Sequence, residues 1–193
     1  MREQNVFLLS PANLNGKRGK ILLNPDARFE LARTLRSAEG AALVEVYSFV
    51  SGLYFRGKAS YASTFSSGLD PSGAWIITPG GGLCSFHQRV TVSRLEGWQR
   101  VRVSDDNPHF TAPLLRHACE LADALSPDAR FVLLGSVASS KYVVPLLEAL
   151  GPRLYYPAQF AGMGDMSRGS LLLRCVRERR ELEYVPVETR RWT

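Results

Sequence analysis

The stretch Phe131-Val-Leu-Leu-Gly-Ser-Val-Ala-Ser-Ser-Lys-Tyr-Val-Val-Pro-Leu-Leu-Glu-Ala-Leu-Gly-Pro-Arg-Leu-Tyr-Tyr-Pro157 indicates the fold class of this chain. It opens with a continuous apolar run, Phe131–Gly135, and closes with a short β-type run, Arg153–Pro157. Between them, an amphipathic segment begins after Ser139 or Ser140 and stops at Gly151-Pro152, where a helix commonly ends. Apolar runs separated by amphipathic helices are typical of a mostly parallel sheet covered on both faces. We therefore predict a three-layer α/β/α fold with a mostly parallel central sheet.

The rest of the chain continues this alternation of strands and helices. Its 193 residues, of which 45% are hydrophobic, correspond to about one domain, and we expect a single α/β domain over residues 1–193. We expect further strands at Asn5–Ser10, Ala41–Val46, Ala74–Thr78 and Arg89–Leu95, and further helices from Asn24-Pro25, over Ser51–Phe65 and over about Pro108–Leu125.

The charge balance is basic. Lys and Arg total 24 against 18 Asp and Glu, the formal net charge is +6, and arginine greatly outnumbers lysine. Arginine suits phosphate because its guanidinium donates several hydrogen bonds in one plane. Nucleic acid is therefore the leading partner class, although a modest basic excess also serves plain solubility. The sequence does not identify a protein partner.

Cysteine usage and hydropathy indicate that the protein resides in a reducing cytoplasm. Cys84, Cys119 and Cys175 are far apart and odd in number, which argues against a disulfide framework and against a cysteine-based zinc site. The three histidines, His87, His109 and His117, show no metal-ligand spacing, so we expect no metal and no cofactor. No apolar window approaches the ~18 residues that span a bilayer, and we expect no membrane partner.

Four polar segments follow predicted strands: Ser10–Gly19, Glu45–Lys58, Thr78–Gly82 together with Gly135–Tyr142, and Gly162–Gly169. The carboxyl ends of parallel strands lie at one edge of a sheet, so these segments are expected to converge on one cleft. The first segment offers Asn13, Asn15, Lys17 and Arg18 among glycines, a composition that binds an anion or positions a water, or that simply forms a surface turn.

Two carboxylates are candidate catalytic groups. Glu45 stands in the apolar run Val44-Glu-Val46 and is either an outward-facing strand residue paired with an arginine or an acid–base catalyst. Asp165 stands among glycines beside Arg168, and it either pairs with that arginine or acts on a ligand. The Walker pattern is absent, and Gly80-Gly-Gly lacks the dinucleotide fingerprint, which disfavours an NTPase or a Rossmann dehydrogenase.

Several polar and aromatic residues are candidates for binding a nucleotide. Aromatic and basic side chains that interleave can stack a base while holding phosphate, although tyrosines at helical spacing also serve a core. Serine and lysine at the start of a helix favour phosphate, although ordinary capping explains serine equally well. These candidate substrate-binding residues are Tyr47, Ser48, Tyr54, Arg56, Lys58, Ser136, Lys141, Ser167 and Arg168.

Five segments together resemble a bacterial family related to the uracil-DNA-glycosylase-like superfamily. They are Tyr47-Ser-Phe-Val-Ser-Gly-Leu-Tyr-Phe-Arg-Gly-Lys-Ala-Ser-Tyr-Ala62, Ile76-Ile-Thr-Pro-Gly-Gly-Gly-Leu83, and the closing set Leu133-Leu-Gly-Ser136, Lys141-Tyr142 and Gly164-Asp-Met-Ser-Arg-Gly169. The resemblance implies the α/β fold of that superfamily and cleavage of a base–sugar bond in DNA. It implies a water-positioning residue after the first strand, a place that Asn13 or Asn15 matches. The superfamily's later motif centred on histidine is absent.

The resemblance makes a DNA glycosylase the expected function, and phage-defence enzymes that remove bulky modified bases are one branch to which the chain could belong. Cleavage places positive charge on the sugar and negative charge on the base, so Glu45 or Asp165 would serve the sugar. Arg168, Ser167 or Lys141 would hold the base or its phosphates. The alternatives are a transferase that exchanges or modifies a base, and a non-catalytic module that binds nucleic acid or a nucleotide.

Overall fold

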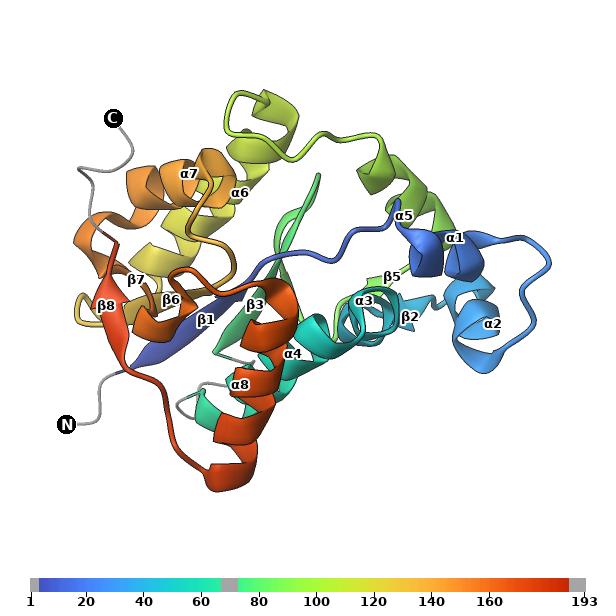
Figure 1. Ribbon diagram of the computed structural model, residues 1–193. Coiled ribbons are helices and arrows are strands. Elements are labelled where there is room, and N and C mark those ends of the chain that lie inside the picture. Colours follow the sequence, from blue (N-terminus) through green and yellow to red (C-terminus); the bar gives the residue numbers. More distant parts are fainter. Residues whose placement is uncertain (1–3, 67–72, 188–193) are drawn as a thin grey trace.

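The computed structural model describes residues 4–66 and 73–187 of the 193 (Figure 1). Within these ranges the central sheet has six strands in the order β4-β3-β1-β6-β7-β8. Neighbours β3, β1, β6 and β7 are parallel, while β4 and β8 join the two edges antiparallel. The expected α/β fold with a mostly parallel sheet is confirmed. The strands are β1 (Asn5–Leu9), β3 (Ala74–Thr78), β4 (Gly82–Ser85), β6 (Arg130–Leu134), β7 (Leu154–Pro157) and β8 (Tyr184–Pro186).

Helices fill most of the connections between these strands. They are α1 (Lys17–Leu23), α2 (Glu30–Arg36), α3 (Leu43–Ser51), α4 (Leu53–Phe65), α5 (Val92–Gln99), α6 (Pro108–Asp123), α7 (Ser140–Leu150) and α8 (Asp165–Glu178). The 3-10 turns η1 (Gly151–Arg153) and η2 (Ala158–Phe160) flank β7. A small antiparallel pair, β2 (Ala41–Ala42) and β5 (Arg89–Val90), lies apart from the main sheet.

Both faces of the sheet are buried. In β1, Phe7 and Leu9 belong to one hydrophobic cluster, which includes side chains of α3, α4 and α8. Val6 and Leu8 point to the opposite face and belong to a second cluster with side chains of α6 and α7. Figure 1 shows α4 and α8 on one side of the sheet and α6 and α7 on the other. Strands buried on both faces read as continuous apolar runs, which explains why Phe131–Leu134 was recognisable as β6.

The order of the strands creates a switch point at the carboxyl ends of β1 and β6. From β1 the chain moves to β3 on one side, and from β6 it moves to β7 on the other. Right-handed crossovers then place the intervening helices on opposite faces, which leaves a crevice between the two departing loops. The loops after β1 and β6 therefore open onto the place where α/β sheets bind ligands.

Three of the secondary-structure predictions are wrong. Ala41–Val46 is not a strand, because only β2 is extended and α3 follows at once; Leu43, Val46, Tyr47 and Val50 have helical spacing and are all buried. The helix expected from Asn24-Pro25 begins later, at Glu30 of α2, where Ala32 and Leu35 are buried as predicted, whereas Asn24 is the C-cap of α1. Most of Arg89–Leu95 is helix α5 rather than strand.

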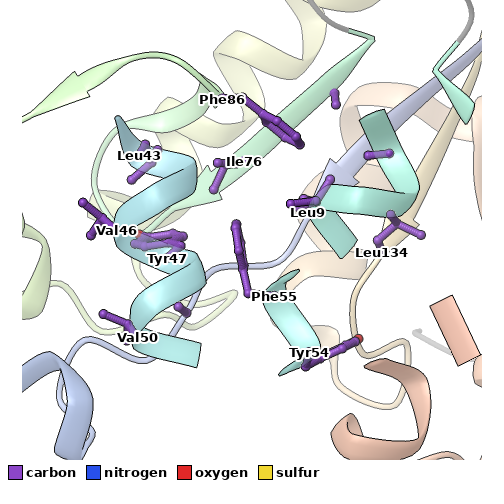
Figure 2. Close-up of a cluster of buried hydrophobic side chains, with 14 of the residues drawn as sticks. Leu9, Leu43, Val46, Tyr47, Val50, Tyr54, Phe55, Ile76, Phe86 and Leu134 are labelled. Atoms are coloured by element: carbon purple, nitrogen blue, oxygen red, sulfur yellow. The ribbon is translucent and has the colours of Figure 1, made fainter. Parts of the chain in front are cut away.

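A glycine separates α3 from α4. Gly52 has φ 65° and ψ −124°, a conformation that side chains strongly disfavour, and it allows the chain to turn between the two helices. The predicted helix over Ser51–Phe65 is thus realised as α4, which begins at Leu53. Figure 2 shows Tyr47 of α3 beside Phe55 of α4, and their rings meet edge to face at 5.3 Å between centroids. The turn at Gly52 therefore lets consecutive helices share one core.

A second close approach joins α4 to α8. A Cβ on Gly57 would lie 2.9 Å from the carbonyl oxygen of Gly169, and a Cβ on Gly169 would lie 2.9 Å from Cα of Tyr54. Both distances are shorter than a carbon side chain tolerates. The two glycines therefore let the helix backbones touch, and this contact fixes the start of α8 beside Tyr54.

Candidate functional site

A cavity of about 850 Å³ lies at the switch point. Its walls come from the loop after β1 and the start of α1, the junction of α3 and α4, the chain from Trp98 to Val103, and the first turns of α7 and α8. The predicted convergence of polar segments therefore occurs at this place. The predicted site residues that line the cavity are Asn13, Asn15, Lys17, Arg18, Tyr54, Ser136, Lys141 and Asp165.

The loop after β1 is held by a tight turn. The Asn13 side-chain oxygen accepts a hydrogen bond from the Asn15 backbone N–H at 3.0 Å, and the Gly16 N–H donates to the Asn13 carbonyl at 3.2 Å. Both asparagine side chains remain exposed at the cavity. The Asn13 oxygen has a second lone pair, and its amide nitrogen is a donor, so Asn13 can hold a water or a ligand oxygen.

The cavity wall is predominantly basic. Asp165 is the only acidic residue among the described lining residues, whereas the basic lining residues are Lys17, Arg18, Arg100, Arg102 and Lys141. Arg102 also pairs with Asp106 at 3.0 Å, and Arg18 donates to the Phe49 carbonyl at 3.3 Å. A wall of this composition favours an anionic ligand such as a phosphate-bearing molecule.

Sequence reasoning missed the segment from Trp98 to Val103. The segment lies beside the loop after β1, where Gln99 Nε2 donates to the Leu14 carbonyl at 3.2 Å. It adds Arg100 and Arg102 to the cavity wall. No motif or periodicity in these residues indicates a site, because the segment spans the end of α5 and the chain after it, and it joins the cavity only through tertiary packing. The basic charge of Arg100-Val-Arg102 was the one available sign.

Asp165 begins α8 and stands at the cavity with its side chain 72% exposed. Its carboxylate lies 3.6 Å from Nη1 of Arg168. Arg168 itself is 5% exposed, donates from Nη2 to the Phe160 carbonyl at 3.1 Å, and does not line the cavity. Arg168 therefore anchors the start of α8 from beneath, which differs from its predicted direct contact with a ligand.

Tyr54 lies at the cavity wall, and one face of its ring is covered. Lys58 Nζ lies 4.5 Å from the centroid of the Tyr54 ring. The residue is 7% exposed, and its hydroxyl makes no hydrogen bond of normal geometry with the described residues. Burial raises the pKa of Tyr54 to about 12, although the nearby Arg168 guanidinium opposes this shift. The phenol therefore stays protonated at neutral pH.

Lys58 lies beneath the cavity and does not line it. It is 1% exposed, and its ammonium donates to the Ser10 carbonyl at 2.6 Å and to Ser10 Oγ at 2.8 Å. Ser10 Oγ in turn donates to the Leu134 carbonyl at 3.3 Å, which links the ends of β1 and β6. Burial lowers the pKa of Lys58 from 10.5 to about 7, against a smaller opposite effect of Asp165. Lys58 therefore supports the loop after β1 from beneath, whereas the sequence predicted that it would contact the substrate.

The other predicted residues lie outside the cavity lining. Glu45 is exposed on α3, because this segment is a helix, and Arg56 and Ser167 are exposed on α4 and α8. Tyr47 is fully buried against Phe55, and burial raises the pKa of Tyr47. Ser48 is half-buried on α3. Of the two candidate carboxylates, the cavity contains Asp165 and excludes Glu45.

Comparisons with known proteins leave the family open: no family model matches the chain, and no curated protein or solved structure matches it either. Within residues 4–66 and 73–187, no three side chains of His, Cys, Asp or Glu gather where they could hold a metal ion. No helix in the same ranges is both long enough and apolar enough to span a bilayer. The cavity itself is therefore the basis for a functional proposal.

Proposed function

We propose that the protein is a DNA glycosylase that hydrolyses the N-glycosidic bond of a base in DNA, with a modified base as the expected substrate. The observation that carries this proposal is the position of Asp165. Among the described residues it is the one carboxylate on a basic cavity wall, and it faces a space that also contains the Asn13 and Asn15 side chains. This composition matches the charges of the reaction, since the substrate is a phosphodiester and the breaking bond leaves a cationic sugar.

Each group then has a task in the hydrolysis. The C1′–N bond breaks with its electron pair moving to the base, and Asp165 stabilises the positive charge that develops on the sugar. Asn13 positions a water, whose oxygen bonds to C1′ and whose proton passes to Asp165 or to solvent. The leaving base takes up a proton from solvent. Lys17, Arg18 and Arg100 hold the phosphates on either side of the extruded nucleotide.

The cavity volume supports a substrate of this size. A volume of about 850 Å³ falls in the upper part of the range usual for small-molecule pockets, and it accommodates a nucleotide with a bulky base. Removal of a modified base from phage DNA would serve antiviral defence. The substrate series in the test below therefore includes bases of increasing bulk.

A second candidate is a non-catalytic module that binds nucleic acid or a nucleotide. The observation that favours it is the ion pair between Asp165 and Arg168 at 3.6 Å, which gives the carboxylate a structural task. In that case Asp165 braces Arg168, and the basic wall alone holds phosphate. A base-exchanging transferase would use the same cavity and would release a base only when a second base is supplied.

Product analysis separates these functions. The protein is incubated, without added metal, with DNA that carries uracil, hydroxymethylcytosine or glucosylated hydroxymethylcytosine, and free bases are detected by mass spectrometry. We expect one base to be released by the wild type and by Glu45→Gln, whose carboxylate lies outside the cavity. Asp165→Asn should lower the rate about 100-fold or more. Bound but intact DNA would favour the binding module, and release that requires an added base would favour the transferase.

A further inference from the structure

Ser10 and Lys58 form a pair of side chains that the proposed base hydrolysis does not use. Ser10 follows β1 directly, lines the cavity and is 6% exposed, and Lys58 of α4 lies beneath it. Lys58 Nζ is 2.8 Å from Ser10 Oγ and 2.6 Å from the Ser10 carbonyl oxygen. A hydroxyl at a cavity, within hydrogen-bond reach of a nitrogen base that a further contact orients, is the arrangement of an activated nucleophile.

The surroundings of Lys58 favour an amine that accepts a proton. The side chain is 1% exposed and packs against the rings of Tyr54 and Phe55. Two charged groups act on it, both from α8: Asp165 raises the pKa of Lys58 and Arg168 lowers it, and these two pair with each other at 3.6 Å. Burial outweighs both and lowers the pKa to about 7, so much of the amine is neutral at physiological pH.

The hydrogen bonds around Ser10 fit both protonation states of Lys58. A charged ammonium donates to the Ser10 carbonyl and to Oγ, and the hydroxyl then donates to the Leu134 carbonyl, 3.3 Å away. A neutral amine still donates to the Ser10 carbonyl, while its lone pair accepts the hydroxyl proton. In the neutral state Oγ therefore keeps both of its own lone pairs for an electrophile.

The loop after β6 places no side chain over the Ser10 hydroxyl. A Cβ on Gly135 would lie 3.0 Å from Ser10 Cβ and 3.2 Å from Ser10 Oγ, which is tighter than most contacts of this kind. The next residue, Ser136, lines the cavity. Glycine at position 135 therefore leaves Oγ free of a side chain where this loop reaches the cavity.

We propose that Ser10 is the nucleophile, and Lys58 the proton acceptor, of an acyl-transfer reaction on esters that carry a negatively charged group. This activity goes beyond the proposed base hydrolysis and does not depend on it. Serine–lysine pairs attack carbonyl carbons in enzymes of unrelated fold. The basic wall selects an anionic substrate, and it stabilises the negative charge that develops on the carbonyl oxygen.

The reaction proceeds in two halves. Ser10 Oγ bonds to the carbonyl carbon while its proton moves to Lys58 Nζ. The bond between that carbon and the alcohol oxygen breaks, and Lys58 returns the proton to the departing alcohol. A water then attacks the acyl-serine and gives its proton to Lys58, which passes it to Ser10 Oγ as that oxygen leaves. The products are a carboxylic acid and an alcohol.

Covalent labelling tests the nucleophile directly. A biotinylated fluorophosphonate, which loses fluoride as its phosphorus bonds to an activated serine oxygen, is incubated with the full chain, and mass spectrometry locates the label. We expect one label, on Ser10, that forms faster as the pH rises through 7, because only the neutral amine accepts the proton. Ser51 is the matched control. It is exposed on the same cavity wall, no lysine bonds to it in the described ranges, and it should stay unlabelled.

Two variants separate activation from exposure. Ser10→Ala should abolish labelling, and Lys58→Met should slow it about 100-fold or more. If Lys58→Met does not fold, the labelled position and the pH profile of the wild type decide the question. No label, a label on other serines, a rate independent of pH around 7, or equal rates for Lys58→Met and the wild type would overturn the assignment. Asp165→Asn should lose base release but still be labelled on Ser10, so the two activities are tested separately.

A pair of chromogenic esters of equal chain length tests the substrate class. These are p-nitrophenyl hemiglutarate, which carries a carboxylate, and the neutral p-nitrophenyl valerate. We expect the wild type to hydrolyse the anionic ester with a kcat/KM about tenfold or more above that of the neutral one, and Lys141→Gln to reduce this preference. Ser10→Ala should hydrolyse neither ester above the rate in buffer. Equal kcat/KM values for the two esters would overturn the anionic class, and full activity of Ser10→Ala would overturn the nucleophile.

Discussion

Replacement of Lys58 by Met should change how the stability of the protein depends on pH. Lys58 is 1% exposed and donates to the carbonyl and the hydroxyl of Ser10 at the end of β1. Methionine has a similar length but does not titrate. The variant therefore removes a buried ionisable group while it keeps most of the packing between α4 and the sheet.

The size of the effect follows from the pKa of the amine. Burial lowers the pKa of Lys58 from 10.5 in the unfolded chain to about 7 in the folded protein. Between these values the unfolded state binds more protons, so the free energy of unfolding of the wild type rises with pH. The slope is about 1.4 kcal/mol per pH unit for one group, which gives about 3 kcal/mol between pH 7.5 and 9.5. Below pH 7 the contribution is flat.

The measurement is urea unfolding of wild type and Lys58→Met at intervals from pH 6 to 9.5. Other groups titrate equally in both proteins, so the difference in free energy of unfolding isolates Lys58. We expect this difference to shift in favour of the wild type as the pH rises above 7. A difference that stays constant would refute the reasoning, because Lys58 would then keep an ordinary pKa despite its burial.

A direct titration supports the same test if the variant folds poorly. The lysine Cε resonances of the wild type, assigned by NMR, should include one that titrates near pH 7. Asp165 opposes the lowering of the Lys58 pKa and Arg168 adds to it, so the midpoint should fall in Asp165→Asn. A Lys58 resonance that titrates near 10 would contradict the structure.

Two further predictions concern packing and charge. Gly169→Ala should destabilise the protein by about 1–3 kcal/mol, because the added Cβ would overlap the backbone of α4. Gly97→Ala in α5 places its Cβ in open space and should stabilise the protein by about 0.5–1 kcal/mol. Thermal unfolding measures both effects. Lys17→Gln and Arg100→Gln should each reduce the slope of log Kd for DNA against log salt by about 0.7–0.9, while Arg28→Gln, outside the cavity, leaves it unchanged. Equal salt slopes in all three variants would show that the basic cavity wall does not contact DNA.

The sequence was sufficient to predict the alternation of strands and helices in the central sheet. Strands such as β1 and β6 are buried on both faces and therefore appear as uninterrupted apolar runs. The segment Ala41–Val46 was misread because a short, mostly apolar run does not by itself distinguish a strand from a partly buried helix. Because this segment is a helix, Glu45 lies on the exposed side of α3 and does not line the cavity.

Predictions for the site succeeded where they followed from topology. The loops after β1 and β6 converge because they leave parallel strands at one edge, and this rule needs only the order of elements. The burial of Lys58 beneath Ser10 and the arrival of Arg100 at the cavity depend on tertiary packing between distant segments. Sequence patterns carry no sign of either contact. The functional assignments of the lining residues remain predictions.

The most direct test of the account is base release in water enriched in ¹⁸O, with the DNA substrates described above. Hydrolysis assisted by Asp165 predicts a free base together with ¹⁸O at C1′ of the abasic sugar, at equal rates for wild type and Glu45→Gln and at a rate lower by about 100-fold or more for Asp165→Asn. Equal release by Asp165→Asn and wild type, or DNA that is bound by the wild type but never cleaved, would contradict it.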